Sequence, residues 1–187
     1  MSPITAKLAG LRAATTTLKR GGLIAHHTAT LPGVAAHPRS ALAINRLCRF
    51  KQRQGPFLLL ADSVKTAMQQ IRFFSPRLRK LIKESWPGAV TIIVPAKPGL
   101  SKQCYDRSSM AIRVDTSAQT RLLAHACGGL LLSSSLNRKG GKPLKVSRKT
   151  FLRLHSFLDA RLPGPAGSGN ASTILRVWRN DSTTIRS

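Results

Sequence analysis

The sequence predicts an α/β (α+β) fold: a single twisted, mostly mixed sheet with helices on its faces. Short apolar runs of strand length alternate along the chain with helical patterns, which is typical of a sheet covered by helices. The chain has 187 residues, 42% of them hydrophobic, which is enough for one core and short for two. We find no internal repeat at solenoid spacing. We therefore expect a single domain over residues 1–187.

The first element is a helix that begins at Ser2 and Pro3, a cap followed by a favoured first helical residue. Leucines at helical spacing give it an apolar face, and the pair Gly21-Gly22 ends it. Residues 1–20 are also basic and free of acids, as organellar transit segments are. Both interpretations stay open, and a helix of the domain is our expectation.

The later elements are marked by serines at helix starts, by Pro76 directly after Ser75, and by the pair Gly128-Gly129 after a helical run. Runs rich in Leu, Ile and Val mark the strands. Prolines and glycines in residues 162–170 predict a loop. In chain order we expect a strand at 22–27, a helix at 40–51, a strand at 56–60, a helix from 62 or 63, a helix at 75–85, strands at 89–94 and 110–114, a helix at 117–127, a strand at 130–133, a helix at 147–158 and a last strand at 172–178.

Net charge is the strongest compositional signal. The 31 lysines and arginines face 6 acids, which gives a formal net charge of +25. Self-repulsion of this size opposes a compact state unless a polyanion lies nearby, and nucleic acid is the commonest polyanionic partner. A merely basic protein, or one from a lineage with a biased composition, is the alternative. We expect contact with RNA, either tRNA or rRNA.

One basic segment, interrupted by glycines and a proline, runs from Arg138 to Lys145, and the helix after Ser147 continues it. This composition predicts an exposed loop, for which a solvated surface without a partner is the alternative. The candidate RNA-binding residues are Arg138, Lys139, Lys142, Lys145, Arg148 and Lys149.

Several kinds of site are excluded. Cys48, Cys104 and Cys127 are odd in number and widely spaced, which excludes a disulfide framework and a CxxC metal site and fits a reducing, cytoplasmic compartment. His26 and His27 are neighbours on an expected strand and point to opposite faces, so we expect no metal site there. No apolar run approaches the length of a membrane span. The chain also lacks the GxSxG sequence of serine hydrolases.

Five separated segments carry the most specific signals, in a fixed order. They are Lys51-Gln52-Arg53 at a helix end, Ser85-Trp86-Pro87-Gly88-Ala89-Val90-Thr91 before a strand, Ala111-Ile112-Arg113-Val114, Ser133-Ser134-Ser135-Leu136-Asn137, and Ala171-Ser172-Thr173-Ile174, with Ile185-Arg186 near the end. In this order they resemble the KxR, WPGPxT, AxRxP, SxSAN and PSTI motifs of the YrdC/TsaC family of threonylcarbamoyl-AMP synthases. Residues 27–34 occupy the place of the family's first loop. The resemblance covers nearly the whole chain.

The resemblance implies a YrdC-like fold with a concave basic pocket, and a nucleotidyltransferase activity. L-threonine, bicarbonate and ATP would give threonylcarbamoyl-AMP (L-threonylcarbamoyladenylate), pyrophosphate and water. Downstream proteins would then transfer the threonylcarbamoyl group to an adenosine of tRNA, giving threonylcarbamoyladenosine. ATP would be a substrate, and Mg²⁺ would be bound mainly by oxygens of the nucleotide and by water.

The same resemblance assigns roles to residues of this chain. The implied groups are catalytic residues, residues around threonine, and residues that hold ATP. These are, for catalysis, Lys51, Arg53 and Arg113; for threonine, Thr28, Thr91, Arg113 and Ser172; and for ATP, Lys51, Arg53, Ser133, Ser135, Asn137 and Arg186.

These residue types suit the implied chemistry. Transfer to the α-phosphate accumulates negative charge, which fixed cations and hydrogen-bond donors stabilise. Arginine clamps a carboxylate or phosphate with two parallel hydrogen bonds, whereas lysine supplies a mobile point charge. Ser133 and Ser135 lie two apart at a strand end and therefore point the same way. Ordinary turn chemistry, in which these hydroxyls satisfy the local backbone, is the alternative.

The chain departs from the family pattern at three places. His27, Ala29 and Pro32 stand where the family's first loop has a proline, an acid and an aromatic residue. The segment Gln54-Gly55-Pro56-Phe57 lacks the proline that directly follows the family's KxR motif, and a downstream lysine. Leu136 replaces a small alanine, so we expect it to crowd the nucleotide pocket. The alternative function is a catalytically degenerate YrdC-fold protein that binds tRNA or the ribosome; a structural component of a ribonucleoprotein is a weaker third.

Overall fold

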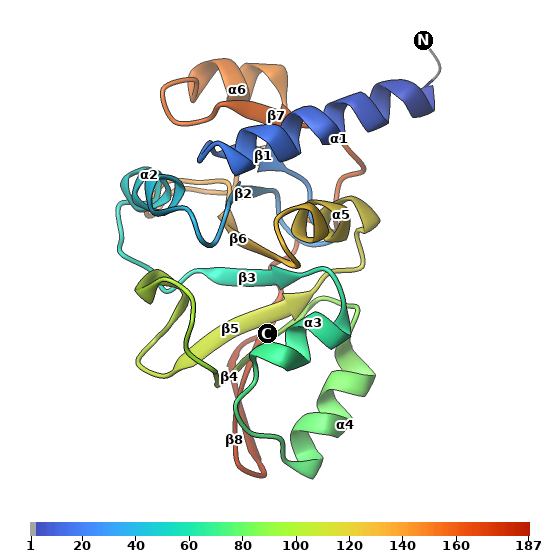
Figure 1. Cartoon of the computed structure of the whole chain (residues 1–187), viewed down its shortest axis with the longest axis vertical. Helices are drawn as coiled ribbons and strands as arrows, with labels where there is room; N and C mark the ends of the chain where they lie inside the picture. The colour runs from blue at the N-terminus through green and yellow to red at the C-terminus, as the bar shows by residue number, and fades with distance from the viewer. Residues whose placement is uncertain (1–2) are drawn as a thin grey trace.

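The computed structural model describes residues 3–187, with side chains described from residue 8 onward. A 9-stranded sheet runs through it in the order β7-β1-β2-β6-β3-β5-β4-β8-β9 (Figure 1). The strands are β1 Ile24–His26, β2 Gly33–Ala36, β3 Leu58–Ala61, β4 Val90–Pro95, β5 Ser109–Val114, β6 Leu130–Ser135, β7 Ala160–Leu162, β8 Thr173–Trp178 and β9 Asp181–Arg186. The helices are α1 Pro3–Lys19, α2 Ala41–Lys51, α3 Val64–Gln70, α4 Pro76–Ser85, α5 Ala118–Ala126 and α6 Arg148–Arg153, with a 3₁₀ turn at Lys102–Cys104.

The sheet is mixed, as the sequence predicts. The pairs β1–β7, β3–β5 and β4–β8 are parallel. The remaining neighbours, β1–β2, β2–β6, β3–β6, β4–β5 and β8–β9, are antiparallel. Because β3 and β5 lie at the centre, the ends of strands that are far apart in sequence meet there.

Serine N-caps start the helices from α2 onward. The Oγ atoms of Ser40, Ser75 and Ser147 accept hydrogen bonds from backbone N–H groups of the first turn, at 3.2, 3.2 and 3.0 Å. Ser63 and Ser117 do the same for α3 and α5. These bonds satisfy N–H groups that have no partner within the helix, so the predicted starts of these helices are confirmed.

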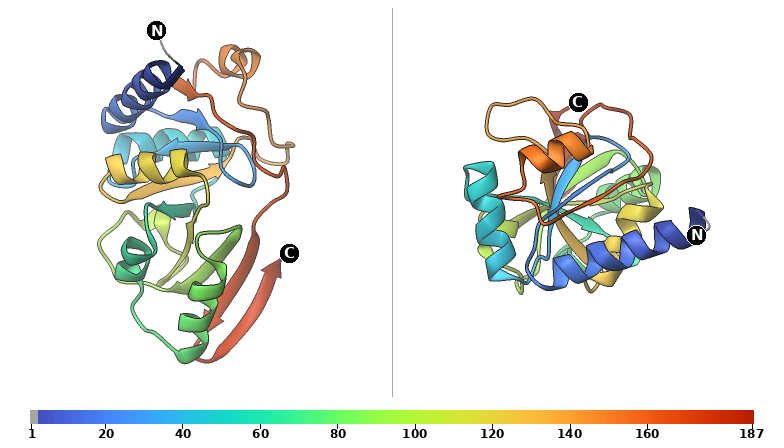
Figure 2. Two further views of the ribbon diagram at one scale, coloured as in Figure 1. Left: turned by 90° about the vertical axis from the view of Figure 1, so that its right-hand side faces the viewer. Right: turned by 90° about the horizontal axis from the view of Figure 1, so that it is seen from above.

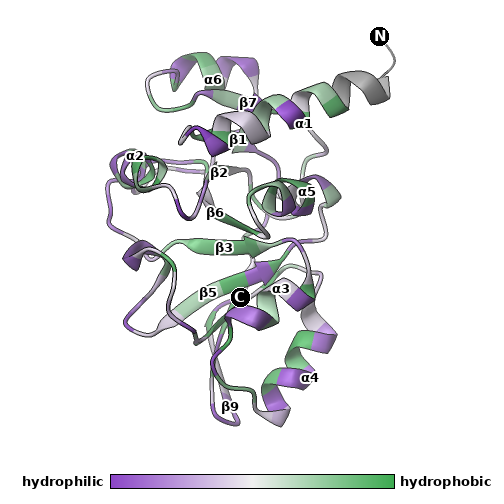
Figure 3. Ribbon diagram, in the orientation of Figure 1, coloured by the Kyte–Doolittle hydropathy of each residue, from purple (hydrophilic) through white to green (hydrophobic). Residues whose placement is uncertain are grey.

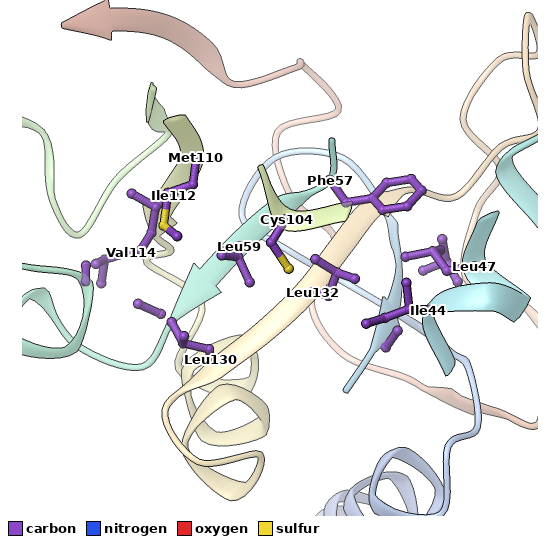
Figure 4. Close-up of a cluster of buried hydrophobic side chains, with 14 of the residues drawn as sticks. Ile44, Leu47, Phe57, Leu59, Cys104, Met110, Ile112, Val114, Leu130 and Leu132 are labelled. Atoms are coloured by element: carbon purple, nitrogen blue, oxygen red, sulfur yellow. The ribbon is translucent and has the colours of Figure 1, made fainter. Parts of the chain in front are cut away.

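Side chains of alternating strand residues fall into two hydrophobic clusters, one for each face of the sheet. On one face, Leu59 of β3 and Leu132 of β6 pack with side chains of α2, α3 and α4. Figure 4 shows these two leucines with Ile44 and Leu47 of α2. On the other face, Leu60 and Leu131 pack with α1 and α5. Figure 3 shows β3 and β6 as largely hydrophobic, whereas hydrophilic and hydrophobic residues alternate along α4. Both faces of the central strands are therefore buried under helices.

The structure differs from the sequence-based expectation at short or polar strands. β2 lies where the family's first loop was expected, and β9 follows the strand expected to be last. β2 has only four residues and β9 is rich in hydroxyl side chains, so neither shows an apolar run of strand length. The expected helix at 147–158 ends at Arg153, and the three-residue β7 was not expected.

All three cysteines are free and buried. Burial raises the pKa of the Cys104 and Cys127 thiols to about 11. Within residues 3–187, no helix is long and apolar enough to cross a membrane. The helix expected at the N-terminus is present from Pro3, whereas its expected cap, Ser2, lies outside the described residues.

Candidate functional site

A cavity of about 310 Å³ lies on the sheet face that α1 and α5 cover only in part. Leu58, Ser133 and Ser135 line it and share the strand parity of Leu60 and Leu131, which are buried under those two helices. The face thus changes along the strands from an apolar packing surface to a hydroxyl-lined wall. The predicted site residues that line the cavity are Thr28, Arg53, Thr91, Arg113, Ser133, Ser135, Ser172 and Arg186.

Arg113 is the most deeply placed cation of this cavity. It belongs to β5, and only 2% of its surface is exposed. Its guanidinium donates to Thr30 Oγ1 at 2.9 Å and to the Asp115 carboxylate at 2.6 Å. Its Nε–H has no hydrogen-bond partner among the described residues. Burial lowers the pKa of Arg113, whereas Asp115 raises it, so the guanidinium keeps its charge beside a single acid.

Asp115 fixes both Arg113 and the loop after β1. It is fully buried, and its second carboxylate oxygen accepts backbone N–H bonds from Ala29 at 3.0 Å and from Ser117 at 2.8 Å. In the same loop, Thr28 Oγ1 lies 3.0 Å from Thr30 Oγ1 and donates to the Leu31 carbonyl. Asp115 and Thr30 were not among the predicted site residues. For Asp115, the sequence signal is an acid that follows the motif residue Arg113 by two positions.

Three side chains from distant segments meet at the opposite wall. Thr91 Oγ1 of β4 lies 3.0 Å from Ser172 Oγ, which directly precedes the parallel strand β8. Arg186 of β9 donates to the Ser172 carbonyl at 2.8 Å and to its hydroxyl at 3.2 Å. The parallel pairing of β4 with β8 and the return of β9 bring these groups together.

Ser133 is paired with a histidine that the sequence did not predict as a site residue. His26 Nε2 lies 3.2 Å from Ser133 Oγ, and the histidine is fully buried. Burial lowers the pKa of His26 to about 4, so its ring is neutral at pH 7. A Cβ atom at Gly33 would lie 2.7 Å from His26 Nε2 and 3.0 Å from Ser133 Oγ, so only glycine leaves this pair intact.

Lys51 lies behind the cavity wall and does not line it. Its Nζ donates to the carbonyl of Ser135 at 2.9 Å, to the side-chain oxygen of Asn137 at 2.8 Å, and to the Asn137 carbonyl. Ser135 Oγ also donates to the Asn137 side chain, at 2.6 Å. Burial, and then Arg53, lower the pKa of Lys51 to about 8. The ammonium group therefore holds the 135–137 turn in shape with all three of its N–H bonds.

Arg53 stands at the exposed rim. Its guanidinium lies 4.5 Å from the centre of the Phe57 ring and donates to the Pro56 carbonyl at 2.7 Å. These contacts hold the side chain at the edge of the cavity that it lines. Together with Arg113 and Arg186 it makes the lining cationic, and no acid lines the cavity within residues 3–187.

One sequence expectation is wrong here. Leu136, which we expected to crowd the pocket, is fully buried in the hydrophobic core instead. It directly follows β6 and packs in the same cluster as Leu132, on the face opposite to Ser135. The replacement of a small residue at this position therefore leaves the cavity open.

The basic segment lies apart from the cavity. Arg138, Lys139, Lys142, Lys145, Arg148 and Lys149 are all exposed, and none lines the cavity. Leu144 and Val146 pack against the hydrophobic core, so the segment is anchored between its charged residues. Within the described part of the chain, no group of three or more His, Cys, Asp or Glu side chains could hold a metal ion.

Comparisons with known proteins bear on the family of the chain. Residues 16–187 match the Sua5_yciO_yrdC family, which is described as "Telomere recombination". The threonylcarbamoyl-AMP synthase of Thiobacillus denitrificans is 35% identical over 155 residues, which are 78% of this chain and 80% of that protein. The threonylcarbamoyl-AMP synthase of Halorhodospira halophila is 30% identical over 177 residues, which are 91% of each chain.

Solved structures share the fold. Sua5 of P. abyssi in complex with L-threonine superposes with a TM-score of 0.85 at 18% identity, over 94% of this chain and 53% of that chain. This chain therefore spans about half the length of that Sua5. E. coli YciO superposes with a TM-score of 0.83 at 20% identity, over 95% of this chain and 88% of that chain. With the family match extending over residues 16–187, the chain belongs to the Sua5/YciO/YrdC family.

Proposed function

We propose that this chain is a threonylcarbamoyl-AMP synthase, which converts L-threonine, bicarbonate and ATP into threonylcarbamoyl-AMP, pyrophosphate and water. Relatives of this name cover most of the chain, and the related Sua5 structure contains L-threonine. The alternative of a catalytically degenerate RNA-binding protein is not favoured. The nine-stranded sheet supports the expectation of one domain over residues 1–187.

One observation carries the proposal: Arg113 lines the cavity, is buried, and has an Nε–H without a partner among the described residues. Because buried donors in native proteins are almost always satisfied, an unpartnered guanidinium N–H at a cavity supports a site for an anion. Asp115 and Thr30 hold the fork in one orientation. A carboxylate accepts two parallel hydrogen bonds from such a fork.

Threonine fits the deep part of the cavity. Its carboxylate would accept from Arg113, which is the innermost cation. The hydroxyl groups of Thr28, Thr91 and Ser172 would surround the remainder of the amino acid. The Thr91 and Ser172 hydroxyls lie 3.0 Å apart and would act as a pair. This is the assignment that the sequence motifs imply, and the shared cavity supports it.

ATP fits the outer part, where the cations are exposed. Arg53 and Arg186 stand at the rim and would contact the phosphates, and Ser133 and Ser135 would donate from the wall. Lys51 and Asn137 would act on the nucleotide through the shape of the 135–137 turn. Direct contact of Lys51 with a phosphate would require it to give up one of its present acceptors.

The chemical step needs charge stabilisation more than proton transfer. The amine of threonine adds to the carbon of bicarbonate with loss of water and gives a carbamate. A carbamate oxygen then attacks the α-phosphorus, the bond from that phosphorus to the bridging oxygen breaks, and pyrophosphate leaves. Arginine donors at the rim would stabilise the charge that develops on the phosphate oxygens.

Mg²⁺ would enter as part of the nucleotide substrate. The cavity lining is cationic, and no described group of side chains forms a metal cage. Phosphate oxygens and water are ligands that Mg²⁺ accepts in nucleotide sites. RNA contact by the segment around Lys142, downstream transfer proteins and a cytoplasmic location stay predictions.

The test is threonine- and bicarbonate-dependent release of pyrophosphate from ATP by the full-length chain. Arg53→Ala removes a rim donor and should lower kcat/KM for ATP by roughly 10²-fold to 10³-fold. Arg49→Ala is the matched control, because Arg49 is an exposed arginine of the same helix region that does not line the cavity. It should keep wild-type kinetics.

Arg113→Ala and Lys51→Ala complete the set, with folding checked by circular dichroism because both side chains are buried. Folded Arg113→Ala protein should bind threonine too weakly for saturation. Absence of threonine-dependent turnover in the wild-type protein, or equal losses in Arg53→Ala and Arg49→Ala, would contradict the proposed function.

A further inference from the structure

A second cavity lies between the start of α4 and the turn that joins β8 to β9. Its volume is about 400 Å³, and Phe73, Phe74, Val177 and Trp178 contribute to its lining. Phe73 is 61% exposed and Trp178 is 57% exposed, which is unusual for large aromatic side chains. Figures 1 and 2 both show the tip of the β8–β9 hairpin beside the start of α4. We call this feature the aromatic groove.

Guanidinium groups surround the aromatic groove. The guanidinium carbon of Arg72 lies 5.1 Å from the centre of the Phe73 ring, and that of Arg79 lies 5.0 Å from the centre of the Phe74 ring. Arg179 lines the groove directly. Arg179 also adopts a left-handed backbone conformation, with a φ of 53°, at a hairpin position that usually takes Asn or Gly. The turn thus places an arginine where local preference disfavours one.

These cations have no acidic partners. Arg72, Arg79 and Arg179 form no salt bridge with any acid in the part of the chain that the structure describes. Arg176, on β8 three residues before Arg179, differs because it pairs with Asp106 at 3.4 Å. Since the whole chain carries a net charge of +25, the field at the groove attracts a polyanion.

We propose that the aromatic groove binds single-stranded RNA, with bases stacked on Phe73 and Trp178 and phosphates held by Arg72, Arg79 and Arg179. Aromatic side chains with interleaved cations are the physical requirement for such binding, because every base has a stacking face and every nucleotide a phosphate. An acidic peptide would satisfy the cations but would leave the two exposed aromatic faces without a planar partner.

The proposed RNA site does not overlap the catalytic cavity. β8 joins Ser172, in the catalytic cavity, to Trp178, in the aromatic groove. The strand holds Ser172 and Trp178 roughly 20 Å apart. The two linings share no residue, although they approach each other along β4, where Ile93 lines the catalytic cavity and Pro95 lines the groove. RNA binding at the groove and adenylate synthesis in the cavity can therefore be measured separately, and one can fail while the other holds.

Tryptophan fluorescence gives a direct measurement. Trp178 is exposed, whereas Trp86 is 6% exposed and its indole N–H donates to Val90. Stacking of a base should quench the emission of Trp178 when an unlabelled oligouridylate of about 12 nucleotides is added. This length is within the usual range of single-stranded binding sites. Trp178→Phe keeps an aromatic surface and should bind the oligonucleotide while losing the quench.

Affinity measurements separate stacking from general charge. Phe73→Ala combined with Trp178→Ala should weaken binding of the same oligonucleotide, end-labelled for anisotropy, by at least about 10-fold, since each stacked base contributes roughly 5-fold to 150-fold. Arg72→Ala with Arg79→Ala should also flatten the dependence of log Kd on log salt by about 0.7 for each lost phosphate contact. All variants should retain wild-type pyrophosphate release.

The matched control is Arg12→Ala with Arg20→Ala, which removes the same charge from exposed positions at the α1 end of the molecule (Figure 1). Equal weakening by this control and by the groove variants would overturn the proposal, because binding would then follow net charge alone. Quenching of Trp178 by an acidic peptide at concentrations where the oligonucleotide has no effect would overturn it as well. A loss confined to variants at Lys139 and Lys142 would move RNA binding to the basic segment and would also contradict it.

Discussion

The pair formed by His26 and Ser133 shows how a single buried side chain sets the state of a cavity wall. His26 Nδ1 has no hydrogen-bond partner among the described residues, whereas Nε2 faces Ser133 Oγ. A buried acceptor without a partner is tolerated better than a buried N–H without one, which favours the tautomer with the proton on Nε2. In that tautomer His26 donates to Ser133, and the serine hydroxyl keeps its own proton for a ligand in the cavity.

This arrangement makes stability depend on pH. The pKa of His26 is lowered from 6.5 to about 4 by burial. Between these values the unfolded chain binds more protons than the folded one, so the free energy of unfolding should fall as the pH drops through this window. His26→Gln keeps a donor toward Ser133 without this ionisation. Urea unfolding from pH 6.5 to 4 should therefore show a smaller acid loss in His26→Gln, by roughly 3 kcal/mol.

Ser133→Ala is the control for this prediction, since it removes the hydrogen bond but keeps the buried histidine. Its acid loss should match that of the wild-type protein. An acid loss of wild-type size in His26→Gln would mean that other groups carry the pH dependence.

Motif residues and their supports differed in how well the sequence predicted them. Arg113, Ser133 and Ser135 carry motif positions, and strand alternation already placed the two serines on one side. Asp115 and Thr30 reach the site through hydrogen bonds across the loop after β1, and no local pattern specifies such contacts. Roles for the motif residues remain predictions, although most of them line one cavity.

At the scale of elements, the loop expected at 162–170 covers the loop after β1. The N–H groups of Ser168 and Gly169 donate to the carbonyls of Ala29 and Thr30, at 3.0 and 3.2 Å. A Cβ atom at Gly167 would lie 2.4 Å from the carbonyl oxygens of Thr28 and Thr30. Backbone packed this closely has no room for a larger residue, so this contact fixes the threonine-side wall.

Gly167→Ala should therefore displace that wall. We expect the KM for threonine to rise by at least about 10-fold, since a shift of about 1 Å in a positioning element costs on the order of 10²-fold in rate. Steady-state pyrophosphate release at varied threonine checks this. Gly141→Ala is the control, because its Cβ would lie 3.4 Å from the Arg138 carbonyl, an ordinary contact. Equal KM values in both variants would contradict the assigned role of the contact.

The elements themselves were predictable where local chemistry decides them. Serine caps and apolar periodicity placed α2, α4 and α5 close to their observed bounds. β2 and β9 were not predicted, because their own residues show no strand pattern. Hydrogen bonds in register to β6 and β8 define these two strands instead. A strand defined by its neighbours has no signature of its own.

At the scale of the whole molecule, charge opposes compactness. A net charge of +25 on 187 residues leaves strong repulsion among surface cations, of which few are paired with acids. Raising KCl from about 0.1 M to about 1 M shortens the screening length from about 10 Å to about 3 Å. The urea midpoint of unfolding should therefore rise with salt, while RNA affinity falls. A midpoint that stays flat or falls would show that the surface cations are already compensated.

The edge strands of the sheet disfavour pairing with a second copy of the chain. The two edge strands are β7, which has three residues, and β9. β9 begins at Asp181, ends at Arg186 and has hydroxyl side chains between them. A short edge strand offers few unpaired backbone groups, and a polar, charged edge strand resists pairing with a second copy. Fibril growth by strand addition is thus disfavoured at both edges of the sheet. The backbone at these edges does not compete with ligands for the surface of the chain.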